Sequence, residues 1–423
     1  MADRAALAHL LRRATFGPRA EEVDAAEKAG YAATVAALLD TTTADAGAAR
    51  TPVPQLPPYQ QKAADQKAAQ QERARQVRAV TVWWLDRMVA ADHQLHEKLT
   101  FFWHGHWATS VEKIKLAQLM LAQQQTLFRT ALGDRGRQVK AMLRDTALIV
   151  WLDGQKNTAK APNENLAREL MELFTLGIGH YSEDDVKAGA RALTGWQVNP
   201  AVGQAVFNPK RHDEQNKTIL GRTGNFDTDG FADILLAQPA NAEFVARRLW
   251  YRFASGDPIP NGLLVPRETT AEMVKAMLES PEFQRTRGHL VKQPVEWAVG
   301  AMRQLGIRPG ELDADQQTQL FSALRQLGQV PFAPPSVGGW PSGAAWLTTS
   351  AAQVRLRAAQ LLAGKAQLGA LGDVPAAMRI EALARLLVVD AFTARTREVL
   401  TAAANEPRRL LALGLASPEY LVS

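Results

Sequence analysis

Hydrophobic residues recur along most of this chain at the three-and-four-residue spacing of amphipathic helices, and no region alternates with the period of two that marks strands. The fold class expected is therefore all-α: a large multi-helix domain of packed helical hairpins with two long irregular loops. The spacing predicts helices over residues 3–13, 19–39, 59–91, 92–103, 111–132, 136–152, 163–176, 231–255, 268–279, 281–286, 291–306 and 314–326, and Ala- and Leu-rich helix from there to the end.

Two stretches interrupt the helical pattern. Prolines and glycines break it across residues 199–230, where a long loop with room for two short strands is expected, and again across 330–349. Loops of this length inside a domain often serve as lids or binding loops. A third, Pro-rich stretch ends at Pro58 and predicts a linker. We therefore expect an N-terminal helical hairpin and linker over 1–58, and a main helical domain over 59–423.

The helix predicted for Asn163–Leu176 has two distinct sides. Its apolar side predicts a core contact, whereas the polar groups gather within about a quarter turn on the opposite side. The apolar set is Leu166, Leu170, Leu173 and Phe174, and the polar set is Asn165, Arg168, Glu169 and Glu172. Gly177 and Gly179 end this helix, His180 follows, and Ser182 with Asp185 forms a capping box for the next one. Two interpretations of this polar side remain: a solvated surface and a functional site.

Five segments, in this order along the chain, carry a family resemblance. Together they resemble the bacterial family called domain of unknown function 1800 (DUF1800), nearly from end to end. The segments are His9–Gly17 (HLLRRATFG), Phe101–Trp107 (FFWHGHW), Asn163–Gly177 (NENLARELMELFTLG), His212–Gly221 (HDEQNKTILG) and Pro334–Trp346 (PPSVGGWPSGAAW). The name of that family assigns no activity, so the resemblance implies membership and not a function.

Composition narrows the classes of function. The 423 residues are 46% hydrophobic and 22% charged, which is typical of a globular protein, and the net charge of +6 is not concentrated in basic runs. A nucleic-acid partner is therefore not expected. The chain has no cysteine, which excludes disulfides and thiolate metal sites. No apolar run is long enough to span a membrane, and the N-terminus lacks a signal-peptide pattern, so a cytoplasmic location is expected.

His104 and His106 are the first candidates for chemistry. Two histidines one residue apart can share a metal only where the backbone between them is extended, and Gly105 would permit such a break. If the helix continues instead, the two side chains diverge by roughly 160°, and His106 becomes a hydrogen-bonded core histidine. Four aromatic residues in Phe101–Trp107 would form a dry shell around either arrangement.

Charged pairs supply the remaining candidates. Glu169 and Glu172 stand three apart on one helix and could bracket a divalent ion, while Arg168 offers a planar fork of donors suited to a carboxylate or phosphate. His212 and Asp213 are adjacent on the long loop, where the acid would orient the imidazole. The sequence Lys292–Glu296 predicts a helix start with its proline in the first turn.

Three hypotheses about function follow. In the first, one pocket holds iron, manganese or zinc and the protein is a metal-dependent hydrolase or oxidoreductase acting on a small molecule or polymer. In the second, the same residues form a buried polar network in a non-catalytic helical scaffold or binding protein. In the third, an acid–base enzyme uses Glu169 as base and Arg168 as anion clamp. The pocket residues of the first hypothesis are His104, His106, Glu169, Glu172, His180, His212 and Asp213.

Overall fold

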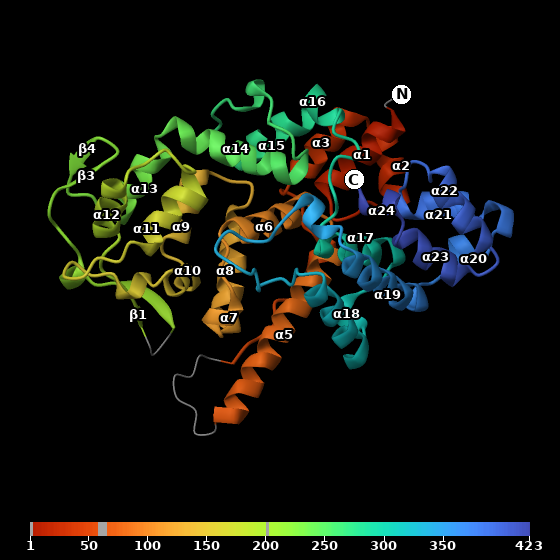
Figure 1. The fold of residues 1–423 in the computed structure, drawn as a ribbon, viewed down its shortest axis with the longest axis horizontal. Coiled ribbons are helices and arrows are strands. Elements are labelled where there is room, and N and C mark those ends of the chain that lie inside the picture. The colour runs from red at the N-terminus through yellow and green to blue at the C-terminus, as the bar shows by residue number, and fades with distance from the viewer. Residues whose placement is uncertain (1–2, 58–65, 200–202) are drawn as a thin grey trace.

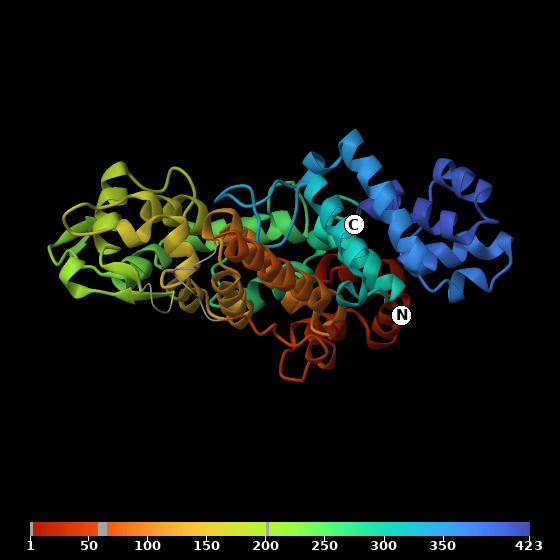
Figure 2. The same ribbon diagram turned by 90° about the horizontal axis from the view of Figure 1, so that it is seen from below.

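The computed structural model describes residues 3–57, 66–199 and 203–423. Within them the chain is predominantly helical, with two small two-stranded antiparallel sheets, and this confirms the helical fold class. The molecule is elongated (Figure 1), and a view from below shows the same long shape (Figure 2). No helix in the described ranges has both the length and the apolar character needed to cross a bilayer.

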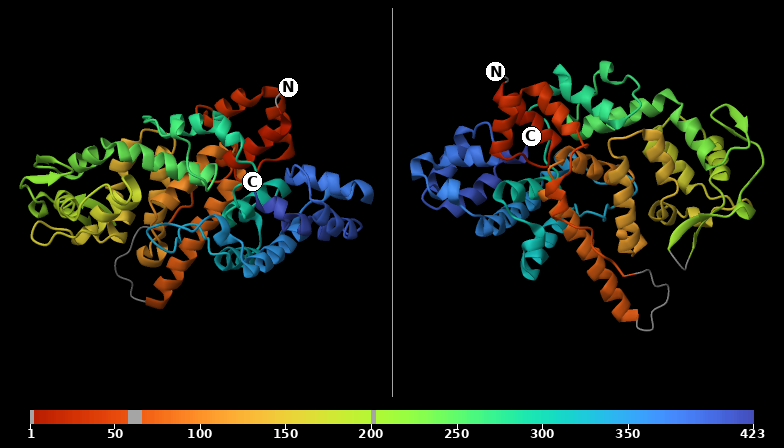
Figure 3. Two further views of the ribbon diagram at one scale, coloured as in Figure 1. Left: turned by 45° about the horizontal axis from the view of Figure 1, so that its top comes forward. Right: turned by 180° about the vertical axis from the view of Figure 1, so that it is seen from behind.

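The first part of the chain runs from red through orange to yellow in Figure 1. They are α1 (Arg4–Ala14), α2 (Ala20–Ala29), α3 (Tyr31–Leu39), α4 (Ala46–Ala49), α5 (Gln66–Ala90), α6 (Gln94–His106), α7 (Val111–Ile114), α8 (Ala117–Thr130), α9 (Arg135–Met142) and α10 (Thr146–Trp151). Helix α5 projects from the middle of the molecule, as two further views also show (Figure 3).

The middle part contains every strand of the described residues (Figure 1). Its elements are η1 (Gly154–Lys156), α11 (Asn165–Glu169), the π-helix η2 (Leu170–Thr175), α12 (Glu183–Ala192), β1 (Trp196–Asn199), β2 (Gln204–Phe207), η3 (Pro209–Arg211), β3 (Lys217–Ile219), β4 (Arg222–Gly224), α13 (Thr228–Leu236), α14 (Pro239–Phe253), η4 (Asn261–Leu263) and α15 (Thr270–Glu279). Its strands, α12 and α13 lie at one end of the molecule, and α14 and α15 run back toward the middle.

The last part reaches the opposite end of the molecule with α20 to α23 (Figure 1). Its elements are α16 (Pro281–Gln284), α17 (Pro294–Leu305), η5 (Pro309–Glu311), α18 (Ala314–Gln326), η6 (Gly343–Trp346), α19 (Thr349–Lys365), α20 (Gly369–Gly372), η7 (Ala376–Met378), α21 (Arg379–Leu387), α22 (Ala394–Ala402), α23 (Pro407–Leu415) and α24 (Pro418–Leu421).

Several predicted helices are shorter than expected. The helix predicted for 19–39 is two helices, because Gly30 between α2 and α3 has a φ of 88°. The helix predicted for 111–132 breaks at Lys115, which is left-handed with a φ of 61°. The one predicted for 136–152 restarts at Asp145, whose carboxylate accepts from the Leu148 amide and caps α10. The sequence predicted a single helix in each case because the apolar residues on the two sides of the break keep the same helical spacing.

The N-terminal helices pack onto the rest of the chain. Helix α1 contacts α6 and α16, and α3 contacts α15. The Trp83 indole donates to the Thr51 carbonyl at 3.0 Å, and the Gln118 amide donates to the Pro57 carbonyl at 2.7 Å. The predicted boundary at 58 and the predicted start of the next helix lie outside the described residues, so the division into 1–58 and 59–423 stays a prediction.

The two predicted irregular stretches differ in what they contain. Residues 196–224 form two hairpins, β1–β2 and β3–β4, so strands are more numerous than the sequence indicated. Pro200 of this predicted loop is outside the described residues. Residues 330–349 are irregular as predicted, apart from the single turn η6.

Helix α6 lies between the two large hydrophobic cores. Its Phe102, Trp103 and the following Trp107 belong to one core, which they share with Phe174 of η2. Its Phe101 belongs to the other core, which contains Trp84, Trp297 and Phe332. A helix that is buried on all sides in this way has few positions for charge, so its polar side chains need partners from neighbouring elements.

Candidate functional site

His104 and His106 face different cores because α6 continues through Gly105 to His106 without a break. The His104 ring lies against Trp84, Phe332 and Trp340. The His106 ring lies against Phe102, Trp103, Trp107 and Phe174. The continuous-helix alternative is therefore the one observed, and the two rings do not converge on one metal.

Backbone hydrogen bonds assign the tautomers of both rings. The Phe332 amide donates to His104 Nε2 at 3.0 Å, so this nitrogen is the acceptor. His106 Nε2 lies 3.0 Å from the Phe174 carbonyl, which can only accept, so His106 carries its proton there and Nδ1 is a bare lone pair. Burial lowers the pKa of each ring to about 3, which keeps both neutral.

Arg168 and Glu169 lie on α11, where Arg168 is already neutralised. Arg168 donates to both oxygens of Glu183 at 2.7 Å and to Glu164 at 3.0 Å. Its donor fork is thus occupied by neighbouring carboxylates. Burial and the neighbouring Glu172 raise the pKa of Glu169, which is half-buried. The polar side of this helix is largely an ion-pair surface.

Glu172 lies on η2, a π-helical turn that the sequence gave no sign of. The Leu176 amide donates to the Met171 carbonyl, the five-residue spacing of a π-helix. The wider turn buries Met171 and leaves Leu173 only half-buried, which corrects the apolar side drawn from the α-helical wheel. Glu172 accepts from the Tyr181 hydroxyl at 2.6 Å.

Three of the predicted residues line one hollow, named here the His106 cavity. Its volume is about 360 Å³, and it lies between η2, α14 and the loop before Trp340. The residues that line it include His106, Glu172, Leu176, His180, Phe244 and Arg248. His180 is exposed at its edge, and His106 Nδ1 is buried without a hydrogen-bond partner among the described residues.

His212 and Asp213 belong to a different place. Thr194 approaches His212 Nδ1 with its carbonyl at 2.9 Å and its hydroxyl at 3.1 Å. Asp213 forms a two-pronged ion pair with Arg191 at 2.6 and 3.1 Å, which lowers the pKa of that carboxyl. These contacts connect the region of the two hairpins to α12 and to Thr194, and both side chains already have partners within the protein.

The predicted metal donors therefore do not form one set. In the part of the chain that the structure describes, no three His, Asp or Glu side chains are arranged to hold a metal ion. His104 and His106 face opposite cores, and Asp213 pairs with an arginine. The donor geometry gives the metal hypothesis no support.

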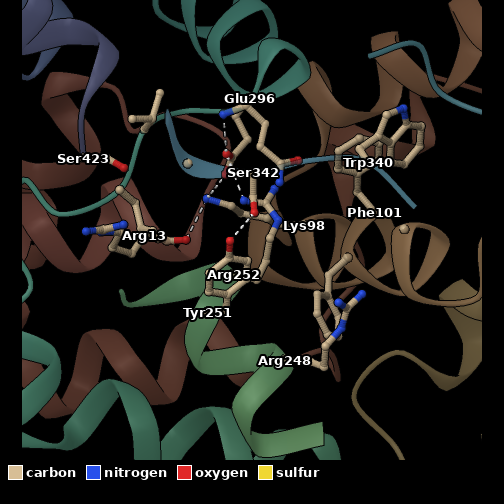
Figure 4. Close-up of a pocket in the computed structure, with 16 residues that line it drawn as sticks. Arg13, Lys98, Phe101, Arg248, Tyr251, Arg252, Glu296, Trp340, Ser342 and Ser423 are labelled. Atoms are coloured by element: carbon tan, nitrogen blue, oxygen red, sulfur yellow. Dashed lines mark hydrogen bonds and ion pairs between the residues drawn. The ribbon is translucent and has the colours of Figure 1, made fainter. Parts of the chain in front are cut away.

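A second, smaller hollow lies on the other side of Arg248, and is named here the basic cavity. It measures about 80 Å³, which is room for several water molecules or one compact anion. Most of its lining comes from α1, α6, α14, α17 and the 330–349 loop, and Figure 4 shows Lys98, Arg252 and Glu296 close together at its centre. The charged side chains among the described residues lining it are four cations and one carboxylate: Arg13, Lys98, Arg248, Arg252 and Glu296. Ser423, the last residue of the sequence, also lines it.

Glu296 is held as an anion at the centre of this cluster. It accepts from Lys98 at 2.7 Å, from Arg252 at 3.0 Å and from the Gln293 amide at 3.0 Å. Burial alone would disfavour the carboxylate, but Arg252 and Lys98 hold the pKa of Glu296 far below its usual range. The predicted helix start is confirmed here, since Gln293 caps α17 and Pro294 is its first residue.

Lys98 has no donor to spare. Its ammonium bonds the Arg13 and Thr15 carbonyls at 2.7 Å each, as well as Glu296. Burial lowers the pKa of Lys98 to about 8, which leaves it protonated at neutral pH. This lysine is a fixed charge and not a nucleophile.

Three arginines at the basic cavity keep unused donors. Arg252 bonds Glu296 through Nη1, and its Nη2 has no partner among the described residues. Arg13 is 1% exposed and donates to the Thr286 carbonyl, but its Nε and Nη1 have no partner among the described residues.

Arg248 lines both cavities, and within residues 3–57, 66–199 and 203–423 it makes no hydrogen bond or ion pair. Burial lowers the pKa of Arg248, and the neighbouring Tyr251 offsets part of that effect.

A family model described as a protein of unknown function (DUF1800) matches residues 9–422. The chain belongs to the DUF1800 family. The resemblance read from five segments is thereby confirmed. No curated protein and no solved structure matches the chain. Three of the segments that carry the DUF1800 resemblance meet at the basic cavity, through Arg13, through Phe101 and Gly105, and through Trp340 and Ser342.

Sequence reasoning missed the cavity residues on α1 and α14. Arg13, Arg248 and Arg252 sit in ordinary amphipathic helices, with no motif around them. One signal was available: Arg12 and Arg13 fall inside the buried half of α1, where a charge needs a partner. Glu296 was visible only as part of a predicted helix start, where it accepts from the backbone amide of Gln293.

Proposed function

We propose that this DUF1800 protein binds a small organic or inorganic anion in the basic cavity. The observation that carries the proposal is Arg248, a partly desolvated arginine that faces two cavities and has no hydrogen bond or ion pair among the described residues. Arg248 is half-buried, and among the described residues lining the same cavity the fully buried guanidinium donors without partners belong to Arg13 and Arg252. A buried donor without a partner costs about 1–3 kcal/mol, and an anion in the cavity would remove that cost.

The surrounding charges favour the same conclusion. Four cationic side chains against one carboxylate leave an excess of positive charge in the lining of the basic cavity. Arg13 adds two buried nitrogens without partners. Guanidinium groups match the oxygens of phosphate and carboxylate in pairs, which suits one compact anion. This proposal develops the binding-protein hypothesis, in which a buried polar network has a ligand.

The enzymatic hypotheses have weaker support. A metal-dependent hydrolase or oxidoreductase would need a donor set that the described residues do not assemble. An acid–base enzyme with Glu169 and Arg168 would need a free guanidinium, whereas Arg168 is engaged with Glu164 and Glu183. An anion site can serve catalysis or binding alone, and the proposal is restricted to binding.

Calorimetric titration with inorganic phosphate, sulfate and acetate, at constant ionic strength, tests the proposal. At least one anion should bind wild type and raise its melting temperature as its concentration rises. Arg248→Gln should weaken that binding by about tenfold to a hundredfold, because hydrogen bonds to charged groups contribute about 1.5–3 kcal/mol. It should not lower the melting temperature, since it removes an uncompensated charge.

Arg168→Gln is the matched control, an arginine whose partners are all within the protein. It should leave anion affinity unchanged. Absence of binding by all three anions to wild type would contradict the proposal. Equal affinity of Arg248→Gln and wild type would also contradict it.

A further inference from the structure

Resting on the anion site proposed above, we infer that the anion is held by two groups of α14, the Arg248 guanidinium and the Tyr251 hydroxyl, and that Ser342 positions that hydroxyl. The inference assigns the basic cavity a second ligand-binding residue and gives the 330–349 loop a part in binding. The acidic group then offers at least two oxygen atoms, one for each donor, as phosphate, sulfate and carboxylate do.

The Tyr251 hydroxyl lies at the exposed rim of the basic cavity. Tyr251 on α14 and Ser342 in the loop both line this cavity, and Ser342 Oγ donates to the Tyr251 hydroxyl oxygen at 2.7 Å (Figure 4). This hydrogen bond is exposed to solvent, and Tyr251 as a whole is 46% exposed. An anion that enters from solvent can therefore reach the hydroxyl.

Tyr251 keeps one donor unused. A phenol hydroxyl has a single proton to donate, and its oxygen here already accepts the proton of Ser342. Among the described residues no acceptor takes the proton of Tyr251. The hydroxyl can thus donate to an anion while Ser342 holds its oxygen in place.

Arg248 and Tyr251 stand on the same side of α14. They are three residues apart in this helix, the spacing that places two side chains on one face, and both line the basic cavity. The pKa of Arg248 agrees with this proximity, since Tyr251 offsets part of the lowering caused by burial. One acidic group between the two side chains can accept from both.

The 330–349 loop brings Ser342 to Tyr251 because the loop is fixed on α6. The Trp340 ring stacks on Phe101 with 5.5 Å between the ring centroids, and the glycine before Trp340 packs against the α6 backbone. These contacts do not involve Tyr251. Removing the Ser342 hydroxyl should therefore leave the loop in place and remove only the support of the Tyr251 hydroxyl.

Tyr251→Phe tests the second donor. The probe is whichever of inorganic phosphate, sulfate and acetate binds wild type most tightly by calorimetry. Tyr251→Phe should weaken its binding by about tenfold, the effect of one hydrogen bond to a charged group, and should leave the melting temperature without the anion near that of wild type. Tyr31→Phe is the matched control, since the Tyr31 hydroxyl donates to the Leu278 carbonyl at 2.8 Å and Tyr31 lines neither cavity; its anion affinity should be unchanged.

Variants of Ser342 test its positioning role. Ser342→Ala should weaken binding by about threefold, the effect of one neutral hydrogen bond, and Ser342→Thr should restore wild-type affinity because it keeps the hydroxyl. The backbone at Ser342 is extended, with a φ of −148°, which suits a β-branched residue. In the Tyr251→Phe background Ser342→Ala should have no further effect, because both changes act through one hydroxyl.

Carbon NMR of protein labelled at tyrosine Cζ gives a readout that does not depend on affinity. The Tyr251 resonance, identified by its absence from Tyr251→Phe, should shift as the anion is added to wild type. The Tyr31 resonance should stay in place.

Each result bears on a different part of the inference. Equal anion affinity of folded Tyr251→Phe and wild type, or an unshifted Tyr251 resonance, would overturn the role of Tyr251 and leave the anion site standing. A loss in Ser342→Ala that Ser342→Thr does not restore, or that adds to the loss in Tyr251→Phe, would overturn the positioning role of Ser342. Failure of wild type to bind phosphate, sulfate or acetate would overturn the anion site and this inference with it.

Discussion

The polar side of α11 and η2 and the lining of the basic cavity contain the same kinds of side chain, but their charges are compensated differently. On α11, Arg168 meets Glu164 one turn earlier and Glu183 on the next helix, and all three are at least one-third exposed. In the basic cavity, the cations come from distant segments and outnumber the carboxylate. The first region is complete as it stands, whereas the second has donors left over. Unused hydrogen-bonding capacity, and not charge density, marks the site.

Acid gives the largest expected effect, and it acts through buried histidines outside both regions. His9, His104 and His106 are buried, and burial lowers the pKa of each to about 3. The unfolded chain binds a proton at each below pH 6.5, so it holds more protons than the folded chain between pH 6.5 and 3. These histidines should therefore lower the free energy of unfolding as the pH falls through that window, by at most about 6 kcal/mol from pH 7 to pH 5. Burial raises the pKa of Asp145 to about 6, so protonation of this carboxyl in the folded chain offsets part of the loss.

Urea unfolding across that pH range measures the effect. His104→Gln should make the pH dependence shallower by about a third, because one of three similar groups no longer titrates. Arg168→Gln should leave the slope as it is. A free energy of unfolding that stays constant between pH 7 and pH 5 would show that the buried histidines do not resist protonation.

Glu296→Gln gives the next largest effect. Removing one partner of a buried ion pair costs about 3–5 kcal/mol, since Lys98 and Arg252 would then lack their counter-ion. The amide keeps the size of the side chain, so the loss measured by urea unfolding reflects charge. Added phosphate should restore part of the stability, because an anion would replace the missing carboxylate. A variant as stable as wild type would contradict the charge balance described here.

The 330–349 loop provides a third comparison. A Cβ at Gly339, whose φ is 83°, would lie 2.3 Å from the Gly105 carbonyl oxygen, so the loop packs directly on the α6 backbone. Gly339→Ala should cost about 2 kcal/mol or more from strain alone and weaken anion binding, since Trp340 and Ser342 follow it. Thermal unfolding and calorimetry measure the two effects.

Gly105→Ala is the control for Gly339→Ala, because Gly105 is the other residue of the contact between the loop and α6. The added carbon would meet the Trp340 ring at 3.5 Å, an ordinary contact, within a helix that alanine favours. It should be neutral or slightly stabilising. Equal destabilisation by both variants would mean that the loop position is not set by the Gly339 contact.

The sequence predicted what depends on neighbouring residues. Helix α18 matches its predicted bounds, 314–326, and the capping box of Ser182 and Asp185 is present. The π-turn of η2 was not predictable, because nothing in the spacing of Leu170 to Phe174 separates an α-turn from a wider one. Arg168 and Glu169 stood out in the sequence because charged residues at helical spacing are easy to recognise. Ion pairs between residues close in sequence are also the ones that are neutralised without a ligand.

The basic cavity could not be assembled from the sequence. Arg13 and Glu296 have no positional relation until α1 and α17 pack beside α6, and Arg248 looks like any polar residue of α14. The His104–His106 pair shows the opposite case, since a continuous helix already required the rings to diverge. The divergence of the two histidine rings follows from helical geometry alone. Predicting the basic cavity requires the tertiary contacts between segments far apart in the chain.

The smallest effect is expected for Arg168→Gln, a change in the polar side of α11 and not in the basic cavity. The ion pairs of Arg168 are partly solvent-exposed, so losing them should cost no more than about 1 kcal/mol in urea unfolding, and less in high salt. Glu183→Gln should give the same small loss, and the double variant should lose little more than either alone, because both remove one interaction. Anion affinity should be unchanged in all three. If Arg168→Gln instead lowered anion affinity as much as Arg248→Gln, the polar side of α11 would be a ligand site after all, and exposed local ion pairs would not separate surface from function in this fold.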